Sequence, residues 1–204
     1  MEKIFTVEEI TQIMNERIAD FDIAKEKIIL RVSSAEKAKK DNSVILKSIG
    51  DISLVLSVII DDDITHTFDT VKVLPETINK WGEKNTIYQV AMDNTVEKYP
   101  ATIKRKNEKP RKILKIRKLK NEIYSLNNPV SIFFPNIKEK IAELYGNSFY
   151  IAFLSESEVV VEPVTFRSSA SITKEIKTIN HVFGFGVTNF AYVYDIHTKK
   201  LKTV

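Results

Sequence analysis

The sequence predicts an α+β protein with mainly antiparallel sheets, packed helices and two halves. Short runs rich in branched and aromatic residues alternate with polar turns, which is typical of antiparallel strands. Other stretches carry apolar residues at spacings of three and four and predict helices. The chain has 204 residues, of which 43% are apolar and 28% are charged. That length and composition suit one large domain or two small ones.

The chain divides around one strongly basic stretch. We expect an N-terminal α+β half over residues 1–103 and a C-terminal α+β half over residues 121–204. Residues 104–120, which we call the basic segment, are expected to connect the two halves.

The first half begins with an amphipathic helix. Thr6 and Glu9 have the spacing of a capping box, in which each side chain bonds the backbone N–H of the other residue. Apolar residues then recur at three and four as far as about Ala19, so the helix is expected to end there.

A sheet is expected next, followed by two helices. The four strands are expected at residues 27–33, 43–48, 52–60 and 67–73. The third strand is apolar throughout, which favours a central position covered on both faces. The polar stretches between the strands predict turns. Pro75 then starts a short helix that Gly82 ends, and a second helix runs from about Asn85 to Thr95.

The second half alternates hairpins with helices. The hairpin turns are expected at residues 127–129, 155–157 and 197–200. The first of these hairpins has its strands at residues 121–126 and 130–134. One helix is expected over residues 135–145, with Gly146 ending it, and another is marked by Ile172, Ile176, Ile179 and Phe183.

The basic segment carries ten Lys and Arg residues against a single Glu, a local charge of +9. The whole chain has a net charge of +4, so the other 187 residues carry −5, and one stretch produces the basic isoelectric point. The candidate residues for binding nucleic acid or another partner are Lys104, Arg105, Lys106, Lys109, Arg111, Lys112, Lys115, Arg117, Lys118 and Lys120.

Three roles stay open for the basic segment: contact with phosphates, contact with an acidic protein surface, and a solvated connector. No aromatic residue is available in it to stack on bases. Its four aliphatic residues, at positions 113, 114, 116 and 119, fit neither a helical stripe nor strict alternation. We expect residues 101–109 to end a strand and form a loop. Residues 111–120 are expected to form a partly buried strand or helix with basic side chains extending to water.

No catalytic constellation, metal site or cofactor site is expected. The chain has no cysteine, which excludes a thiol nucleophile, a disulfide and a Cys-ligated zinc, and favours a reducing, cytoplasmic location. The longest apolar run, at residues 52–60, is too short to span a bilayer, so we expect no membrane partner.

The remaining motifs have structural explanations. Asp61-Asp62-Asp63, with His66 and Asp69 behind them, lack the spacing of a calcium loop and predict an acidic turn. His66, His181 and His197 do not share a helical spacing, so no paired-histidine zinc motif is present. The Gly-Phe-Gly at residues 184–186 follows a predicted helix and lacks the pattern of a phosphate-binding loop.

Residues 43–204 resemble a clostridial (Firmicutes) family of unknown function that is related to the YtpQ-like proteins. In the first half the resemblance is carried by Gly50, Asp51, Trp81, Gly82, Ala91 and Asn94. In the second half it is carried by Leu126-Asn127, the helix through Ala142, the FYIAFLSESEVVVEP stretch and the closing YVYD. Family members have a Pro-Ser-Ser-x-His-Glu run where this chain has FLSESE, which keeps Glu158 but has Ser157 and Phe153 at the His and Pro positions. The resemblance implies a fold and a Gram-positive origin, and no activity.

The sequence therefore favours binding over catalysis, with three hypotheses left open. The first is a non-catalytic protein that contacts nucleic acid, or a nucleic-acid-associated complex, through the basic segment. The second is a protein-interaction or inhibitory factor from a mobile element, for example an anti-CRISPR-like or anti-defence inhibitor of a nucleic-acid enzyme. The third is an enzyme with a dispersed site, for which no motif is present.

Overall fold

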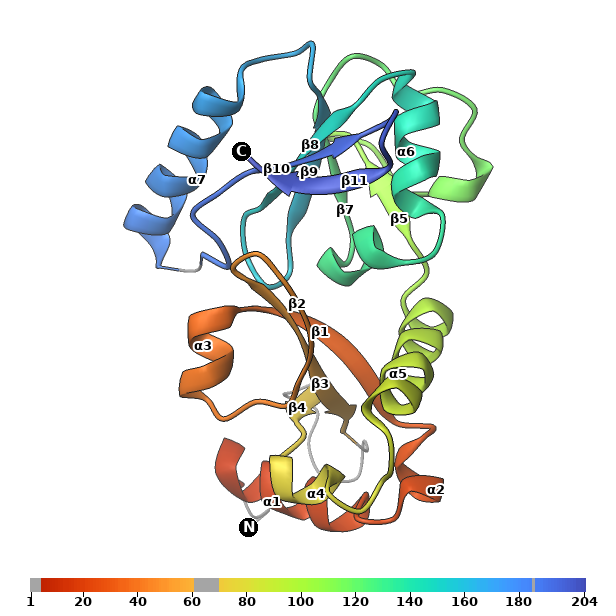
Figure 1. The fold of residues 1–204 in the computed structure, drawn as a ribbon, viewed down its shortest axis with the longest axis vertical. Helices are drawn as coiled ribbons and strands as arrows, with labels where there is room; N and C mark the ends of the chain where they lie inside the picture. The colour runs from red at the N-terminus through yellow and green to blue at the C-terminus, as the bar shows by residue number, and fades with distance from the viewer. Residues whose placement is uncertain (1–4, 61–69, 185) are drawn as a thin grey trace. The chain divides into compact units, whose positions relative to one another are not determined.

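The computed structural model describes residues 5–60, 70–184 and 186–204. It is an α+β protein in which helices pack on antiparallel sheets, as the sequence predicts (Figure 1). The chain forms two compact units, residues 1–49 with 53–98 and residues 50–52 with 99–204. The basic segment lies inside the second unit and contributes strands to its sheet, in contrast to the expected connector. No described helix combines the length and apolar character that crossing a membrane requires.

The first unit packs short helices on a four-stranded sheet whose order is β1-β3-β2, with β4 paired to β3. Its strands are β1 (Ile28–Ser34), β2 (Ile45–Ile49), β3 (Ile52–Ile59) and β4 (Thr70–Lys72). Its helices are α1 (Val7–Arg17), α2 (Phe21–Ala24), α3 (Ala35–Lys40), α4 (Pro75–Ile78) and α5 (Lys84–Lys98). The predicted capping box at Thr6 is present, and β3 is central and almost wholly buried, as expected.

One helix of the first unit lies where the sequence predicts a turn. The Ser34 hydroxyl at the end of β1 accepts the N–H of Lys37 at 3.0 Å and so starts α3. Ala38 is buried, because this short helix packs back on β1. The cap and one apolar contact are enough to form a helix too short for periodicity to predict.

Residues behind the family resemblance have structural roles in the first unit. The Trp81 indole N–H donates to the Ala19 carbonyl at 3.2 Å. The Asn94 amide donates to the carbonyls of Lys25 and Ile28 at 2.7 and 2.8 Å, which ties α5 to the start of β1. These contacts hold segments of the backbone together.

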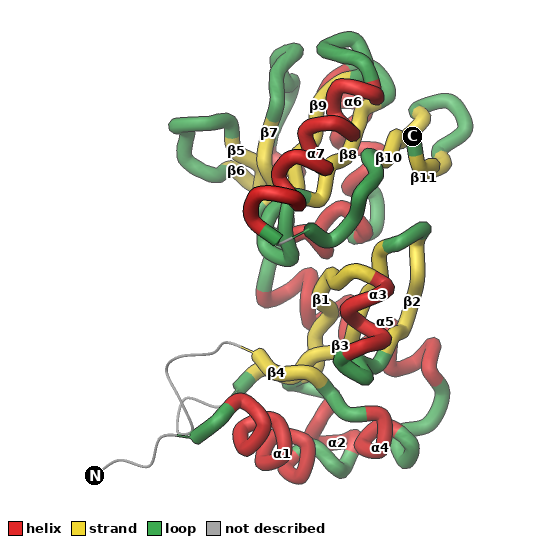
Figure 2. The backbone as a smooth tube through the Cα atoms, turned by 90° about the vertical axis from the view of Figure 1, so that its left-hand side faces the viewer, coloured by secondary structure: helices red, strands yellow, loops and turns green. Residues whose placement is uncertain are grey.

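The second unit is built on a seven-stranded, fully antiparallel sheet whose order is β11-β10-β8-β9-β7-β5-β6 (Figure 2). Its strands are β5 (Thr102–Lys104), β6 (Arg111–Lys112), β7 (Tyr124–Leu126), β8 (Phe149–Phe153), β9 (Val159–Pro163), β10 (Tyr192–Asp195) and β11 (Lys200–Thr203). Its helices are the 3-10 helices η1 (Ile113–Lys115) and η2 (Pro129–Phe133) and the α-helices α6 (Ile137–Tyr145) and α7 (Ser169–Phe183).

Helices cover both faces of this sheet. Successive side chains of a strand point to opposite faces. On β8, Phe149 and Phe153 contact the aromatic rings of Tyr145 on α6 and Phe133 on η2. Ala152 lies on the other face, in an apolar cluster with buried residues of α7. The sheet is therefore the middle layer of the second unit.

The prediction of a hairpin around residues 127–129 is wrong. Residues 130–134 do not return as a strand, because most of them belong to η2. The Asn128 side chain accepts the N–H of Val130 at 3.0 Å, and Pro129 at the first helical position has no N–H to offer a sheet. Strand β7 pairs with β5 and β9 instead. The other two predicted hairpins, β8–β9 and β10–β11, are confirmed.

Residues 50–52 complete a polar cluster of the second unit. The Asp51 carboxylate accepts the Tyr192 hydroxyl at 2.6 Å and the Thr188 hydroxyl at 2.7 Å. Burial, together with the hydrogen bond to Asp51, raises the pKa of Tyr192 well above that of free tyrosine. A Cβ atom on Gly50 would lie 2.6 Å from the Tyr192 hydroxyl, so only glycine fits there without a shift. Gly50 and Asp51, two more residues of the resemblance, therefore also have structural roles.

Candidate polyanion-binding site

Three aliphatic residues of the basic segment anchor it to the core of the second unit. Ile113, Ile116 and Leu119 are 0%, 8% and 3% exposed, and they recur at intervals of three. Ile113 begins η1, a helix type with three residues per turn, and Ile116 has φ −86° and ψ 144°, close to polyproline II. Polyproline II also has three residues per turn. Every third side chain therefore continues to face the core where the backbone changes from the 3-10 helix to polyproline II.

Backbone hydrogen bonds fix both ends of this stretch. The Ile113 N–H donates to the Ala101 carbonyl at 3.1 Å, beside the pairing of β6 with β5. The Leu119 N–H donates to the Leu144 carbonyl of α6 at 2.9 Å. Residues 111–120 are therefore partly buried, as the sequence predicts, but only residues 111–115 form the expected strand or helix and residues 116–120 have no regular secondary structure.

Tyr145 of α6 makes a further contact, just after the C-terminal end of the basic segment. The single O–H of Tyr145 is shared between the carbonyls of Glu122 and Val161, which lie 3.1 and 3.0 Å from the hydroxyl oxygen. Burial raises the pKa of Tyr145 far above that of free tyrosine, and the neighbouring Tyr124 and Glu162 add to the shift. The shift keeps the hydroxyl protonated even at strongly alkaline pH, so its single O–H stays available to the two carbonyls.

The outer surface of this stretch encloses a hollow of about 570 Å³, which we call the basic hollow. The residues that line it are Arg111, Lys112, Lys115, Ile116, Arg117 and Lys118. Five of the six carry a positive charge, and none of these described lining residues is acidic. Since the anchors point inward at every third position, the cations between them gather on the solvent side.

Two glutamates neutralise one edge of the basic segment and leave the hollow positive. Arg105 pairs with Glu122 at 2.8 Å and with Glu108 at 3.2 Å, while Arg111 lies 3.5 Å from Glu108. In the described part of the chain, no ion pair joins Lys112, Lys115, Arg117 or Lys118 to a carboxylate. Arg111 is thus the only lining residue with a described acidic partner.

The structure brings half of the ten predicted binding residues together. Arg111, Lys112, Lys115, Arg117 and Lys118 line the basic hollow. The other five lie on β5, in the β5–β6 loop and at the end of the segment, outside the hollow, and they are Lys104, Arg105, Lys106, Lys109 and Lys120. Only half of the predicted residues therefore share one concave surface.

Among the residues that the structure describes, the other chemistry-bearing side chains do not assemble into a metal centre. His181 lies on α7 and His197 in the β10–β11 turn, both exposed. The acidic turn at residues 61–63, with His66 and Asp69, lies outside the described residues. Over residues 5–60, 70–184 and 186–204, no group of three His, Asp or Glu side chains is placed to hold a metal ion. Ser157 donates its N–H to the Ser155 hydroxyl at 3.2 Å and belongs to the β8–β9 turn.

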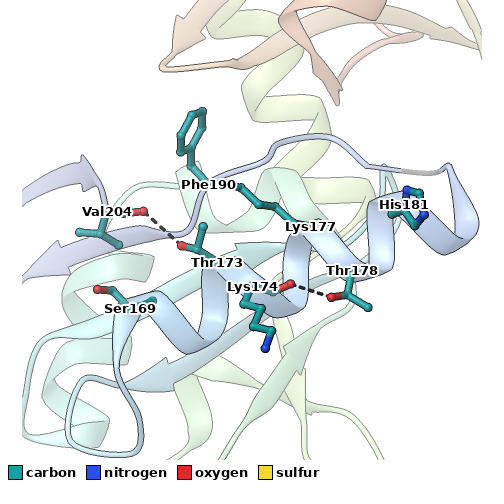
Figure 3. Close-up of a pocket in the computed structure, with 9 residues that line it drawn as sticks. Ser169, Thr173, Lys174, Lys177, Thr178, His181, Phe190 and Val204 are labelled. Atoms are coloured by element: carbon teal, nitrogen blue, oxygen red, sulfur yellow. Dashed lines mark hydrogen bonds between the residues drawn. The ribbon is translucent and has the colours of Figure 1, made fainter.

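Sequence reasoning missed a second concave surface, a groove of about 820 Å³ along α7 (Figure 3). Lys174, Lys177 and His181 recur along this helix at spacings of three and four, which is the one signal that could have indicated it. Its other wall includes Phe190 and Val204, which are far from α7 in sequence and lie beside it only in the fold.

Comparison with known proteins identifies no relative that could name the site. No family model, no curated protein and no solved structure matches this chain. The resemblance to YtpQ-like proteins therefore stays a prediction, and the assignment of a function depends on the geometry of the chain itself.

Proposed function

We propose that this protein binds nucleic acid without catalysis, by contacting phosphates with the basic hollow. One observation supports the proposal most strongly: five of the six residues lining the hollow are Lys or Arg, and none of the described lining residues is acidic. A cation cluster of this kind displaces counterions from a phosphate backbone and gains affinity from their release.

The anchored backbone favours this role over that of a solvated linker. Ile113, Ile116 and Leu119 fix the backbone that carries the cations before a ligand arrives. Ordering a mobile side-chain-rich loop costs binding free energy, and a segment already fixed by buried residues avoids part of that cost.

The lining also indicates which features of a nucleic acid are contacted. No aromatic side chain lines the hollow, so stacking on unpaired bases is not available. Phosphate contacts alone carry no sequence information. We therefore expect little sequence preference and binding to a duplex at least as tight as binding to the corresponding single strand. We also propose a cytoplasmic location, where nucleic acid is present and a chain without cysteine is at no disadvantage.

The test is fluorescence anisotropy with a labelled duplex of about 20 base pairs and its single strand, over a salt series. The variant Lys115→Gln/Lys118→Gln removes two cations from the hollow. If both contact phosphates, the slope of log affinity against log salt falls in magnitude by about 1.8, at about 0.9 per phosphate contact.

The control variant is Lys199→Asn/Lys200→Gln, which removes the same charge from two exposed positions, the last residue of the β10–β11 turn and the first of β11. Asn suits position 199, where φ is 54°. The control is expected to keep the wild-type slope. Absence of salt-sensitive binding, or an equal loss in both variants, would contradict the proposal. No binding at low salt would leave the other two roles of the basic segment, contact with an acidic protein surface and a connector.

A further inference from the structure

The α7 groove has a wall of helix and a wall made by the end of the sheet. Lys174, Lys177 and His181 project from α7, and Phe190, just before β10, and Val204, just after β11, line the same groove beside the helix (Figure 3). Phe190 is 45% exposed and Val204 is 40% exposed. Large apolar side chains are thus left partly uncovered beside a row of basic ones.

The polar groups in the middle of the groove are already engaged within the protein. The Thr173 hydroxyl donates to the Val204 carbonyl at 3.4 Å, and the Thr178 hydroxyl donates to the Lys174 carbonyl at 2.9 Å (Figure 3). Neither hydroxyl needs a partner from outside. A ligand therefore meets a largely apolar surface whose other polar side chains are the Ser169 hydroxyl and the basic ends of Lys174, Lys177 and His181.

The acidic residue of α7 lies away from this groove and does not offset its charge. Glu175 pairs with Arg167, which also holds the buried Glu162, and Glu175 is not among the groove residues. The face of α7 that carries Ile172 and Ile176 is buried against the sheet. The groove face is consequently basic, with no described acidic residue in its lining.

The length of the groove sets the size of its occupant. Its residues on α7 extend from Ser169 to His181, which at about 1.5 Å per residue is about 18 Å. A helix of about three turns has the same length. Helices dock in such grooves through apolar residues on one face, repeated at three and four.

We propose that the α7 groove docks an acidic amphipathic helix of a partner protein. Apolar residues of that helix would pack on Phe190 and Val204, and its Asp or Glu residues would pair with Lys174 and Lys177. The inference does not depend on the proposed nucleic-acid binding. The groove lies beside β10 and β11, at the opposite end of the strand order from the basic hollow at β5 and β6.

The test uses three labelled synthetic peptides of about 15 residues with the full-length protein. The first has Leu on one helical face and Glu on its flanks, the second has Lys in place of Glu, and the third has the Leu and Glu residues scrambled. Anisotropy titrations are expected to show binding of the first peptide alone. The variant Lys174→Gln/Lys177→Gln is expected to bind it roughly two- to thirtyfold more weakly, as two exposed ion pairs would predict.

Two further variants make the result specific. Phe190→Ser removes an apolar wall and is expected to weaken peptide binding, while Lys199→Asn/Lys200→Gln removes equal charge outside the groove and is expected to leave it unchanged. Circular dichroism confirms that each variant is folded.

Four outcomes would overturn the proposal. The first is equal binding of all three peptides, and the second is unchanged peptide binding by the groove variants. The third is self-association of the protein that Phe190→Ser abolishes. The fourth is duplex binding that Lys174→Gln/Lys177→Gln abolishes. The third would make a second copy of the chain the occupant, and the fourth would make the groove part of a nucleic-acid surface.

Discussion

At the scale of single residues, Asn15 uses the full hydrogen-bonding capacity of its side chain inside the first unit. Its amide donates to the carbonyls of Thr11 and Lys72 at 2.8 and 3.0 Å. Its oxygen accepts the N–H of Leu74 and the hydroxyl of Thr77, both at 2.8 Å. The residue is 4% exposed, so water cannot replace these partners. One side chain thus joins α1 to the end of β4, to the residues that follow it and to α4.

The nearly isosteric change Asn15→Asp is expected to destabilise the protein by about 3 kcal/mol. It replaces the donating amide with an oxygen that faces two carbonyl oxygens, and it buries a charge without a partner. Urea unfolding followed by circular dichroism at pH 7 measures the loss. The matched control is Asn85→Asp, an exposed position in the first turn of α5, where a negative charge is tolerated. Similar unfolding free energies for the two variants would contradict this account of Asn15.

At the scale of elements, η1 places two neighbouring aliphatic residues in opposite environments. Ile113 is 0% exposed, whereas Leu114 is 73% exposed. Composition and hydropathy cannot distinguish them, because both are large, aliphatic and flanked by lysine. The geometry of η1 decides which one enters the core.

We expect Ile113→Ala to lower the free energy of unfolding by about 2–4 kcal/mol. Leu114→Ala is expected to change it by less than about 0.5 kcal/mol, because the side chain makes little contact with the protein. Guanidinium unfolding of both variants provides the comparison. A larger loss for Leu114→Ala than for Ile113→Ala would mean that the basic segment packs in a different register.

Helices and turns that are marked by residues close together in the sequence could be predicted. A segment could not be predicted where a hydrogen bond from a neighbouring side chain overrides the preference of its residues for a strand. The capping box at Thr6 and the short turns of the last two hairpins all act over a few residues. The residues of η2 favour a strand by composition, but the Asn128 cap and Pro129 turn them into a 3-10 helix. The basic segment has an apolar period of three, which matches neither an α-helix nor a strand, so only the structure explains its pattern.

At the scale of the whole molecule, charge is distributed very unevenly along the chain. The basic segment carries +9 and the remaining 187 residues carry −5. The density of cations was visible in the sequence, but the subset that shares one hollow was not. That subset depends on the pairing of β5 with β6 and on the three buried anchors. The α7 groove likewise depends on Phe190 and Val204, which only the sheet brings beside the helix.

This uneven distribution predicts strong retention on heparin despite a net charge of only +4. Lys115→Gln/Lys118→Gln is expected to elute at clearly lower salt than Lys199→Asn/Lys200→Gln, although both variants lose two positive charges. Gradient elution at pH 7.5 measures the difference. Coincident elution of the two variants would show that total charge, and not the basic hollow, governs retention.

The three buried anchors of the basic segment recur every three residues. The number of residues between them is therefore more restricted than the identity of those residues. Any cation can replace another between the anchors, since those side chains point to water. Removing one residue between Ile113 and Ile116 would bring Arg117 and Lys120 to the two buried positions that follow Ile113. Inserting one residue would bring Lys115 and Lys118 to these two positions. Either change places two charges in the core. Relatives of this protein should therefore vary in the identity of their cations but keep the number of residues between the three anchors.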